Sequence, residues 1–512
     1  MSNLSEGILF TDFYQLTMAQ LYFKAGIHEQ NVQFDYFFRR YPDYGGHQTG
    51  YCIFAGLESL LNWMEKTAFR KEDIEALRRQ KGVSGRRLFK DNFLDWLAKS
   101  ANFNSLTLQA VPEGRAVHSN TPLAVVRGPL AIAQLLETSL LNHLNYQTLI
   151  ATKASRIAHS AEGRPVIDFG MRRGFGTAVN LATRAAIIGG ARFSSNTGAS
   201  IMLDYPPKGT HSHSMVQAFL ANNKTELDAF RAYAELYPDD CILLADTINT
   251  LKSGVPNAIR VFKELKQKGH EPAGIRLDSG DLAYLSIQTH KMLNESGFPN
   301  TKIVLSNQLD EIVISAICRQ IRAEAVSEKI NPDKLIGRLV FGVGASLVTS
   351  KGCSALDGVY KLTATENNGE WIPALKVSES SAKVPIPGIK KVWRIYDIRN
   401  KATGDLITLN GENPLETSSL LLRHPVETET TRLLERAEIK RIEPLLVNVF
   451  ESGARVGDYG NMGLIANRRI EDLERLDAGV KRLVNPHIYH VSISEALWKT
   501  KNELILRYGA MM

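Results

Sequence analysis

Two histidines stand two residues apart beside a glycine, in the stretch Lys-Gly-Thr-His-Ser-His-Ser from Lys208 to Ser214. A His-x-His pair can hold a divalent metal, as in many barrel hydrolases, but such sites need further His and Asp ligands from later strands. The later expected strand ends supply acids and an asparagine, without a histidine. The alternative is an activated histidine that accepts a proton or a phosphoryl group near neutral pH. The motif alone leaves both interpretations open, together with a plain structural role for two loop histidines.

A second polar motif reads Arg-Leu-Asp-Ser-Gly-Asp from Arg276 to Asp281. Arg276 and Asp278 alternate along an expected strand, so their side chains point to one side. Gly280 allows a tight turn before a helix begins. Such a corner can bind ribose hydroxyls, or a magnesium ion beside a pyrophosphate, with Asp278 as the metal ligand. The plainer interpretation is a helix N-cap with a structural salt bridge, which would suffice for Asp281.

A glycine turn follows another expected strand in Phe-Gly-Val-Gly-Ala-Ser, from Phe341 to Ser346. Gly342 and Gly344 let backbone amides approach an anion closely, and a following helix start adds a favourable dipole. The third glycine of a dinucleotide fingerprint is missing, and no Walker phosphate loop is present. If ATP is used, it is therefore bound in some other way.

The fourth motif is Asp-Phe-Gly-Met-Arg-Arg, from Asp168 to Arg173. The Phe169 ring can stack on a flat substrate, and a guanidinium such as that of Arg172 can pair with a carboxylate or phosphate. A core phenylalanine with surface arginines is the structural alternative. The place of the motif, one strand before the paired histidines, favours the functional interpretation.

The elements that must position these motifs follow a βα rhythm from about Pro165 onward. Polar residues follow each of the expected strands, which are Val166–Phe169, Ile242–Ala245, Gly274–Leu277, Lys302–Leu305 and Leu339–Phe341. Helix start signals are Ser279 and Asp281 ahead of Leu282–Leu293, and Asn307 ahead of Asp310–Ile321. The pattern predicts a parallel sheet or barrel, whose strand C-termini are where ligands gather.

The two ends of the chain follow a different pattern. Thr11 is expected to cap a helix that ends at Gly26, and the expected strands are Val32–Phe38, Val359–Leu362, Val392–Ile395 and Leu406–Leu409. The segment from Ile470 to Met512 is expected to be helical and peripheral. We expect an α/β fold in which 118–357 form the barrel with the active site. Residues 1–117 and 358–512 then form one discontinuous α+β domain.

The amino-acid composition limits the classes of partner that the protein can have. The chain has 512 residues, 44% of them hydrophobic, and a net charge of +7 with basic and acidic residues interleaved. Neither a nucleic-acid-binding motif nor a membrane span is expected. The four cysteines are scattered and the first residues do not resemble a secretory signal, so a reducing, cytoplasmic location is expected.

Taken together and in order, these stretches resemble the nicotinate phosphoribosyltransferase family. The resemblance rests on Thr11–Met18, Phe37–Arg40, Phe169–Arg173, Gly209–Ser214, Arg276–Asp281, Gly342–Gly344, Val359–Leu362 and Lys376–Glu379, and ends at about Arg423. It implies a type II phosphoribosyltransferase fold: an irregular α/β barrel with a second α+β domain built from both chain ends. It also implies a homodimer with shared active sites, in which nicotinate and phosphoribosyl pyrophosphate give nicotinate mononucleotide and pyrophosphate. Family members couple this reaction to ATP hydrolysis through a phosphohistidine, with Mg²⁺.

The resemblance assigns roles residue by residue. His213 is implied to be the phosphorylated histidine and Asp246 the acid that orients it, while Tyr14 of one subunit and Phe169 of the other sandwich the pyridine ring. The remaining implied substrate-binding residues are Arg172, Ser195, Asn196, Thr210, Arg276, Asp278, Asn307, Gly342 and Gly344. Where the related nicotinamide enzyme has an aspartate, this chain has Ser194, Ser195 and Asn196. A neutral loop accepts an anionic nicotinate that an aspartate would repel.

Three other functions stay open on the sequence. A quinolinate phosphoribosyltransferase shares the fold but needs no ATP and is usually shorter. A metal-dependent barrel hydrolase would use the His-x-His pair, and a metabolite-binding or signalling protein would release no pyrophosphate.

Overall fold

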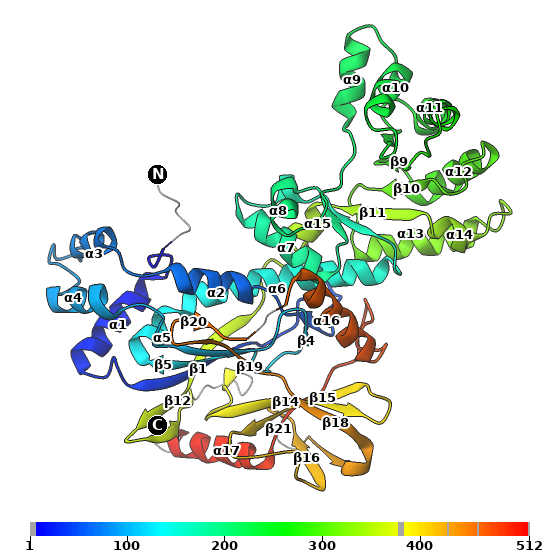
Figure 1. Ribbon diagram of the computed structural model, residues 1–512. Helices are drawn as coiled ribbons and strands as arrows, with labels where there is room; N and C mark the ends of the chain where they lie inside the picture. Colours follow the sequence, from blue (N-terminus) through cyan, green and yellow to red (C-terminus); the bar gives the residue numbers. More distant parts are fainter. Residues whose placement is uncertain (1–6, 377–382, 428–429, 458–459, 510–512) are drawn as a thin grey trace. The chain divides into compact units, whose positions relative to one another are not determined.

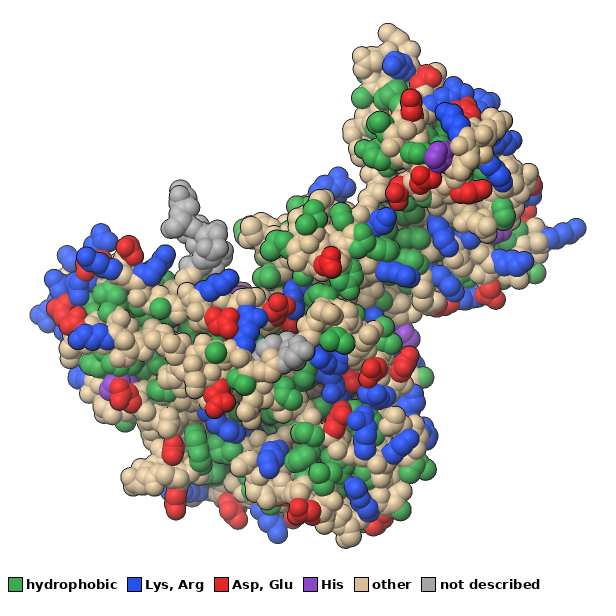
Figure 2. Space-filling view, in the orientation of Figure 1, with side chains coloured by type: hydrophobic (Ala, Val, Ile, Leu, Met, Phe, Trp, Pro, Cys, Tyr) green, Lys and Arg blue, Asp and Glu red, His purple; other side chains and the backbone are tan. Residues whose placement is uncertain are grey.

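The computed structural model describes residues 7–376, 383–427, 430–457 and 460–509. The chain divides into two compact units, one made of residues 1–149 and 355–512 and the other of residues 150–354. Lys and Arg side chains alternate with Asp and Glu side chains over the visible face (Figure 2). Within the described residues, no helix is long and apolar enough to cross a membrane. Val377, Ser378 and Glu379 of the quoted motifs lie outside the described residues.

The unit of residues 150–354 is built on one parallel sheet in the order β7-β6-β11-β10-β9-β8 (Figure 1). Its strands are β6 (Val166–Asp168), β7 (Phe193–Ser194), β8 (Ile242–Leu244), β9 (Gly274–Leu277), β10 (Lys302–Leu305) and β11 (Leu339–Val343). All neighbouring strands pair in parallel. The five strands expected from the βα rhythm are confirmed, and the short β7 is the one that the sequence did not indicate.

Within the described residues no strand pairing joins β7 to β8, and we call the gap between these two strands the seam. These two strands are the sheet edges, and the segment that leads to the histidine motif connects them. The backbone N–H of Lys208 donates to the Ser194 carbonyl oxygen at 2.9 Å. The backbone N–H of Leu244 donates to Nε2 of His211 at 3.0 Å. The fold is therefore mixed α/β, and a loop takes the place of strand pairing at the seam.

Helices follow the strands of this unit. They are α7 (Ala178–Gly189), α8 (Thr197–Met202), α9 (His213–Ala221), α10 (Glu226–Leu236), α11 (Val255–Gln267), α12 (Leu282–Glu295), α13 (Glu311–Glu324), α14 (Pro332–Ile336) and α15 (Ala345–Val348), with the short turns η1 (Met171–Arg173) and η2 (Thr250–Gly254). The Asp281 carboxylate accepts hydrogen bonds from the backbone N–H groups of Ala283 and Tyr284, so the N-cap interpretation of Asp281 is confirmed. At α13 the N-cap is Asp310 and not Asn307.

The other unit contains two larger sheets. The first has the order β13-β12-β1-β5-β3-β19-β20, and the second the order β17-β16-β21-β15-β14-β18. The strands of the first are β1 (Asn31–Phe38), β3 (Thr107–Ala110), β5 (Ala124–Pro129), β12 (Gly358–Asn367), β13 (Glu370–Pro373), β19 (Val447–Glu451) and β20 (Ala454–Arg455). Those of the second are β14 (Lys390–Asp397), β15 (Ala402–Leu409), β16 (Ser419–Arg423), β17 (Thr431–Glu435), β18 (Ile439–Pro444) and β21 (Val491–Ile493). A small sheet pairs β2 (Cys52–Ile53) with β4 (Ala116–Val117).

The two chain ends meet in the first of these sheets. β1 pairs with β12 from Val32 opposite Thr365 to Phe38 opposite Gly358. β5 pairs with β1 and β3, which places it in the same unit. The unit with the parallel sheet therefore begins at Ile150, whereas the sequence analysis expected a start at 118.

The helices of this unit are α1 (Phe13–Ala25), α2 (Leu57–Lys66), α3 (Lys71–Arg78), α4 (Asp91–Ser100), α5 (Leu130–Leu135), α16 (Met462–Arg475) and α17 (Glu495–Gly509), and α6 (Glu137–Ser160) contains the boundary at 149. Gly26 ends α1 with φ 74°, as expected. The N-cap of α1 is Asp12 and not Thr11, because the extended residue next to the first helical turn lies one position later.

The expectation of a helical C-terminal segment is confirmed for the end of α16 and for α17, but it was wrong for the stretch between them. β21 lies between α16 and α17, pairs in parallel with β15, and has three buried residues. A short Val-Ser-Ile run was not recognised as a strand because the helical spacing on both sides dominates the pattern. The last three residues, 510–512, lie outside the described part.

Candidate active site

Polar side chains meet where the parallel strands end. Asp246 and Thr247 follow β8, Asp278 and Ser279 follow β9, and Ser306 follows β10. The first turn of α9 adds the His213 ring, because the seam segment leads directly into that helix. This is the edge at which ligands gather in parallel α/β folds.

The His213 ring is half-exposed and lies among three oxygen-bearing side chains. Its Nδ1 is 3.1 Å from the Thr247 hydroxyl oxygen. Its Nε2 is 3.8 Å from Oδ1 of Asp246 and 3.8 Å from Oδ2 of Asp278. These carboxylates are beyond hydrogen-bond distance but close enough to stabilise positive charge on the ring. The arrangement suits an imidazole that gains a proton or an electrophile.

The Asp246 side chain is only 2% exposed. One carboxylate oxygen, Oδ2, accepts a hydrogen bond of 2.5 Å from the Ser279 hydroxyl. The other, Oδ1, is buried and, within the described residues, has no hydrogen-bond partner. A buried carboxylate oxygen of this kind is ready to accept from a ring N–H or a bound cation.

His211 has a different environment, although it lies two residues away. It is 8% exposed and its ring packs against Phe230 and Tyr233. Burial lowers the pKa of His211 to about 4. Since its Nε2 accepts the Leu244 amide proton, the two histidines do not converge on one point, and the pair is not arranged as a metal chelate. Within the described residues, no group of three or more His, Cys, Asp or Glu side chains forms a metal centre.

Arg276 is held by side chains from two strand ends and from the segment that precedes α9. Its guanidinium donates to the Thr210 hydroxyl at 3.1 Å, to the Ser306 hydroxyl at 2.9 Å and to Asp278 at 3.2 Å. The Ser306 hydroxyl in turn donates to Asp278. The guanidinium carbon lies 5.1 Å from the centre of the Phe169 ring. These contacts place one fixed positive charge beside one aromatic face.

Gly342 makes room for the Phe169 ring. A Cβ at Gly342 would lie 2.3 Å from Cε2 of Phe169, so any larger residue would displace the ring. The backbone N–H of Phe169 donates to the Val343 carbonyl oxygen at 2.8 Å, and a Cβ at Gly344 would lie 3.3 Å from the Phe169 carbonyl oxygen. The Gly-x-Gly motif thus positions an aromatic ring, in addition to any contact with phosphate.

The Phe169 ring borders a cavity of about 490 Å³ inside the sheet unit. Its apolar wall is formed by Ile167, Val304 and Val340 together with Phe193 and Ile242. Lys208, Asp240 and Lys302 also line it. The volume and the aromatic wall suit a small flat ring.

Some expected site residues lie apart from this cluster. Asn196 is 1% exposed, and its side chain donates to Asn180 and Thr183 and accepts from Ala199, which caps α8. Ser195 is half-buried and its backbone N–H donates to the Asp168 carbonyl oxygen. Their roles in substrate binding stay predictions.

Asp168 organises this neighbouring loop. Its buried carboxylate accepts from the Gly170 amide, the Thr183 hydroxyl and the Ser194 hydroxyl at 2.7 to 3.0 Å. Burial raises the pKa of Asp168, against the lowering effect of these three donors. Ser194 is therefore occupied by a structural contact.

The other expected residues are exposed. Arg172 lies on η1, and Asn307 follows β10 with φ 95°, a left-handed conformation that is uncommon outside glycine and often marks functional sites. Tyr14 is 47% exposed on α1 of the other unit. Thr247, Ser279 and Ser306 were missed, although each is a hydroxyl residue at or just past a strand end, which is the signal that would have found them.

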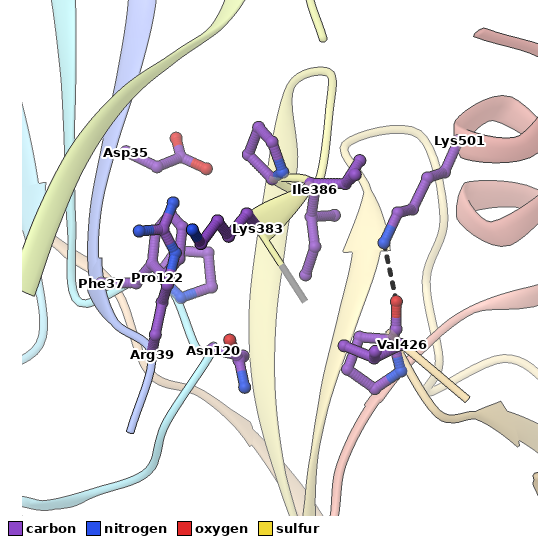
Figure 3. Close-up of a pocket in the computed structure, with 12 residues that line it drawn as sticks. Asp35, Phe37, Arg39, Asn120, Pro122, Lys383, Ile386, Val426 and Lys501 are labelled. Atoms are coloured by element: carbon purple, nitrogen blue, oxygen red, sulfur yellow. Dashed lines mark hydrogen bonds between the residues drawn. The ribbon is translucent and has the colours of Figure 1, made fainter. Parts of the chain in front are cut away.

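A second, basic pocket lies in the unit formed by the chain ends (Figure 3). Arg39, Lys383 and Lys501 line it together with Asp35, whose carboxylate is 2.9 Å from the buried Lys390 ammonium group. The Lys501 amine donates to the Pro425 carbonyl oxygen at 2.7 Å, and burial lowers the pKa of Lys501 to about 8. The surplus of cations favours an anionic occupant.

The fold and the site together define an α/β enzyme in which an exposed imidazole and two carboxylates gather at the ends of parallel strands. Residues 9–145 match the nicotinate phosphoribosyltransferase (NAPRTase) N-terminal domain, and residues 389–501 match the nicotinate phosphoribosyltransferase C-terminal domain. The chain belongs to the nicotinate phosphoribosyltransferase family.

Individual relatives cover nearly the whole chain. Nicotinate phosphoribosyltransferase of Bacillus subtilis (strain 168) is 38% identical over 97% of this chain and 95% of its own length. The enzyme of that name in Caenorhabditis elegans is 32% identical over 98% of this chain and 93% of its own length. The crystal structure of human nicotinic acid phosphoribosyltransferase has a TM-score of 0.80 at 27% identity, over 96% of this chain and 99% of that one.

Proposed function

We propose that this chain joins nicotinate to phosphoribosyl pyrophosphate, forming nicotinate mononucleotide and pyrophosphate in NAD biosynthesis. We propose further that the reaction is coupled to ATP hydrolysis through a phosphohistidine at His213, which makes the enzyme ligase-type. The observation that supports it best is the half-exposed His213 ring between Thr247, Asp246 and Asp278 in a chain of this family.

Glycosyl transfer requires the site to stabilise both a positive charge on the sugar and a negative charge on the leaving group. As the pyridine nitrogen forms its bond to the anomeric carbon, the bond from that carbon to the pyrophosphate oxygen breaks, and positive charge develops on the sugar. A carboxylate such as Asp278 stabilises that charge, while the clamped Arg276 guanidinium stabilises the departing anion. Phe169 holds the weak nucleophile by stacking, and the cavity beside it has room for the ring.

Phosphoryl transfer to His213 uses the same strand ends. A ring nitrogen forms a bond to the γ-phosphorus of ATP as the bond to the bridging oxygen breaks and ADP leaves. The proton on the other ring nitrogen stays, and the nearby carboxylates stabilise the resulting positive ring. The added phosphate charge would then bias binding of the sugar substrate.

Asp278 and the unpartnered oxygen of Asp246 fit a Mg²⁺ ion together with substrate oxygens. When bound, the metal would neutralise charge on the pyrophosphate. Charge on the protein also suits anionic substrates, since Arg276 and Lys208 lie at the site and the basic pocket of Figure 3 lies in the other unit.

The proposed homodimer is supported by exposed apolar side chains beyond the strand ends. Phe175 is 91% exposed, Met202 86% and Ile201 67%, and such side chains are typical of interfaces. We also propose a cytoplasmic location, because the four cysteines are scattered along the sequence without a CxxC pair.

The decisive experiment measures pyrophosphate release from phosphoribosyl pyrophosphate with nicotinate, nicotinamide and quinolinate in parallel, with and without ATP. We expect release with nicotinate, stimulated by ATP, and acid-labile label on the protein from ATP labelled at the γ-phosphate. His213→Ala should lose the label and the stimulation but keep a slow ATP-independent reaction. Release with quinolinate alone, or label that persists in His213→Ala, would overturn the proposal.

A further inference from the structure

Ser306 links two charged side chains at the end of β9. Its hydroxyl oxygen accepts the Nε–H of Arg276 at 2.9 Å, and its hydroxyl proton is donated to Oδ1 of Asp278. The Nη2–H of Arg276 donates to the same carboxylate oxygen at 3.2 Å. Ser306 is only 3% exposed, and its backbone N–H donates to the Leu277 carbonyl oxygen at 3.0 Å. The end of β10 therefore holds this serine in a fixed place beside β9.

The direction of these hydrogen bonds follows from the chemistry of the partners. A guanidinium only donates hydrogen bonds, and an ionised carboxylate only accepts them. The Ser306 oxygen must therefore accept from Arg276, and the one hydroxyl proton must go to Asp278. This serine has a single hydrogen-bonding arrangement as long as both neighbours are charged.

The Ser306 hydroxyl stands where a second carboxylate oxygen would otherwise bind. Nε and Nη2 form the side edge of the guanidinium, which a carboxylate can bind with both of its oxygens in a bidentate ion pair. In this protein that edge donates to one carboxylate oxygen, Oδ1 of Asp278, and to the Ser306 hydroxyl. The remaining nitrogen, Nη1, donates to the Thr210 hydroxyl. The ion pair between Arg276 and Asp278 is therefore monodentate.

The second oxygen of Asp278 stays available as a result. Within the described residues, both hydrogen bonds to this carboxylate end on Oδ1. Oδ2 lies 3.8 Å from Nε2 of His213, and the Asp278 side chain is 27% exposed. Oδ2 is therefore the oxygen that can contact a ligand at the strand ends.

We propose that Ser306 is a positioning residue that keeps the ion pair between Arg276 and Asp278 monodentate, so that Oδ2 is free to contact the sugar substrate. The inference rests on the proposed function of Asp278 in binding phosphoribosyl pyrophosphate. Without the hydroxyl, the Nε–H would lose its acceptor in a largely buried place. The carboxylate would then rotate to offer Oδ2 to Nε, and the bidentate pair would withdraw that oxygen from the substrate.

The test compares Ser306→Ala and Ser306→Cys with the wild type and with the control Ser286→Ala, all as full-length protein. A cysteine occupies nearly the same space as a serine but is a weak donor and acceptor, so it separates loss of the hydrogen bonds from loss of volume. Ser286 is a fully buried serine of α12 whose hydroxyl donates instead to the Leu282 carbonyl oxygen at 2.6 Å.

Three measurements report on different parts of the inference. Crystal structures of the variants show the geometry of the ion pair. Calorimetry with phosphoribosyl pyrophosphate and Mg²⁺ measures binding of the sugar substrate without any need for nucleotide synthesis. Steady-state kinetics gives the KM for nicotinate.

We expect a bidentate pair between Arg276 and Asp278 in both Ser306→Ala and Ser306→Cys. The Kd for phosphoribosyl pyrophosphate should rise about tenfold in both, the lower end of what loss of an orienting partner costs. The KM for nicotinate should stay close to the wild-type value, because the Thr210 contact still holds the guanidinium beside Phe169. Ser286→Ala should bind phosphoribosyl pyrophosphate as the wild type does.

A double variant tests whether Ser306 acts through Asp278. In Asp278→Asn the side chain cannot form a bidentate ion pair, so adding Ser306→Ala should not weaken binding of phosphoribosyl pyrophosphate further. A merely structural role would add its own loss of affinity in the double variant.

The outcomes separate this inference from the function on which it rests. A monodentate pair in Ser306→Ala, or a wild-type Kd for phosphoribosyl pyrophosphate, would overturn the positioning role and leave the proposed function intact. If the wild type does not bind phosphoribosyl pyrophosphate, the proposed function fails. The crystal structure of Ser306→Ala then still decides whether the serine keeps the ion pair monodentate.

Discussion

The backbone N–H of Leu244 donates a 3.0 Å hydrogen bond to Nε2 of His211. Leu244 lies on the edge strand β8, so this imidazole takes the place of a neighbouring strand. The accepting nitrogen must be unprotonated, which agrees with the lowering of the His211 pKa to about 4 by burial. His211 therefore has a structural contact at the seam, whereas the half-exposed His213 ring lies beside Thr247, Asp246 and Asp278.

His211→Ala should therefore affect stability more than chemistry. It leaves the Leu244 amide without its acceptor, which costs about 2 kcal/mol of unfolding free energy. Urea denaturation checks this, with His213→Ala as the control that removes no backbone contact. The folded fraction of His211→Ala should still take label from ATP. Equal stability of the two variants would contradict the structural role.

Acid should destabilise the protein between about pH 6.5 and pH 4. Burial lowers the pKa values of His143, His211 and His290 to about 4 from the ordinary 6.5. In this window the unfolded chain binds protons at these residues and the folded chain does not, so falling pH favours unfolding. Above pH 6.5 all three are neutral in both states and the effect vanishes. Urea midpoints at pH 7, 5.5 and 4.5 measure it, and His211→Gln should reduce the slope.

Gly342→Ala should displace the Phe169 ring, because the added Cβ would lie 2.3 Å from it. We expect the KM for nicotinate to rise about tenfold or more, since stacking is lost with the ring position. The double variant Gly342→Ala with Phe169→Leu should regain stability but not nicotinate affinity. A crystal structure of Gly342→Ala with an unmoved ring would refute this account.

Nicotinate should be preferred to nicotinamide by at least about tenfold in kcat/KM, because about 1.4 kcal/mol of differential binding suffices. The exposed Arg172 and Arg173 of η1, which follow Phe169 in the chain, would attract the carboxylate. Steady-state kinetics with both substrates decides the matter. Arg172→Gln should reduce the ratio of kcat/KM for nicotinate to kcat/KM for nicotinamide. Equal kcat/KM values for the two substrates in the wild type would contradict the predicted preference.

Tyr14→Ala should weaken nicotinate binding without unfolding the protein, because Tyr14 is 47% exposed. If Tyr14 completes the site of a second copy, mixed Tyr14→Ala and Phe169→Ala subunits should regain part of the activity in heterodimers. Size-exclusion chromatography verifies that the dimers form. Absence of any recovery would show that each chain builds its own site.

Much of the fold was readable from the sequence because parallel strands are short, apolar and followed by polar turns. β9 and β10 were predicted to the residue, while β7, with two residues, carries no periodicity. The contact between Thr210 and Arg276 depends on the tertiary fold, so the local sequence pattern does not predict it. The same holds for His211, whose partner is a backbone amide 33 residues away.

The sequence predicted which residues form the candidate site better than it predicted which of them are in contact. Asp278, Arg276 and His213 do come together, as the alternation along β9 and the histidine motif suggested. The sequence could not show that Thr247 rather than Asp246 touches the ring, since a one-residue shift after a strand end reverses which side chain points inward.

The seam between β7 and β8 also affects which connections of the chain can change in length. Paired strands must keep their register, so a change in the length of one connection is transmitted to its neighbours. Here the two edges are joined by two single hydrogen bonds from one segment. The connection that contains α8, α9 and α10 can therefore lengthen or shorten without shifting the other strands. Changes in length should therefore be tolerated in the parts of this connection that lie outside the histidine motif, around α8 and α10.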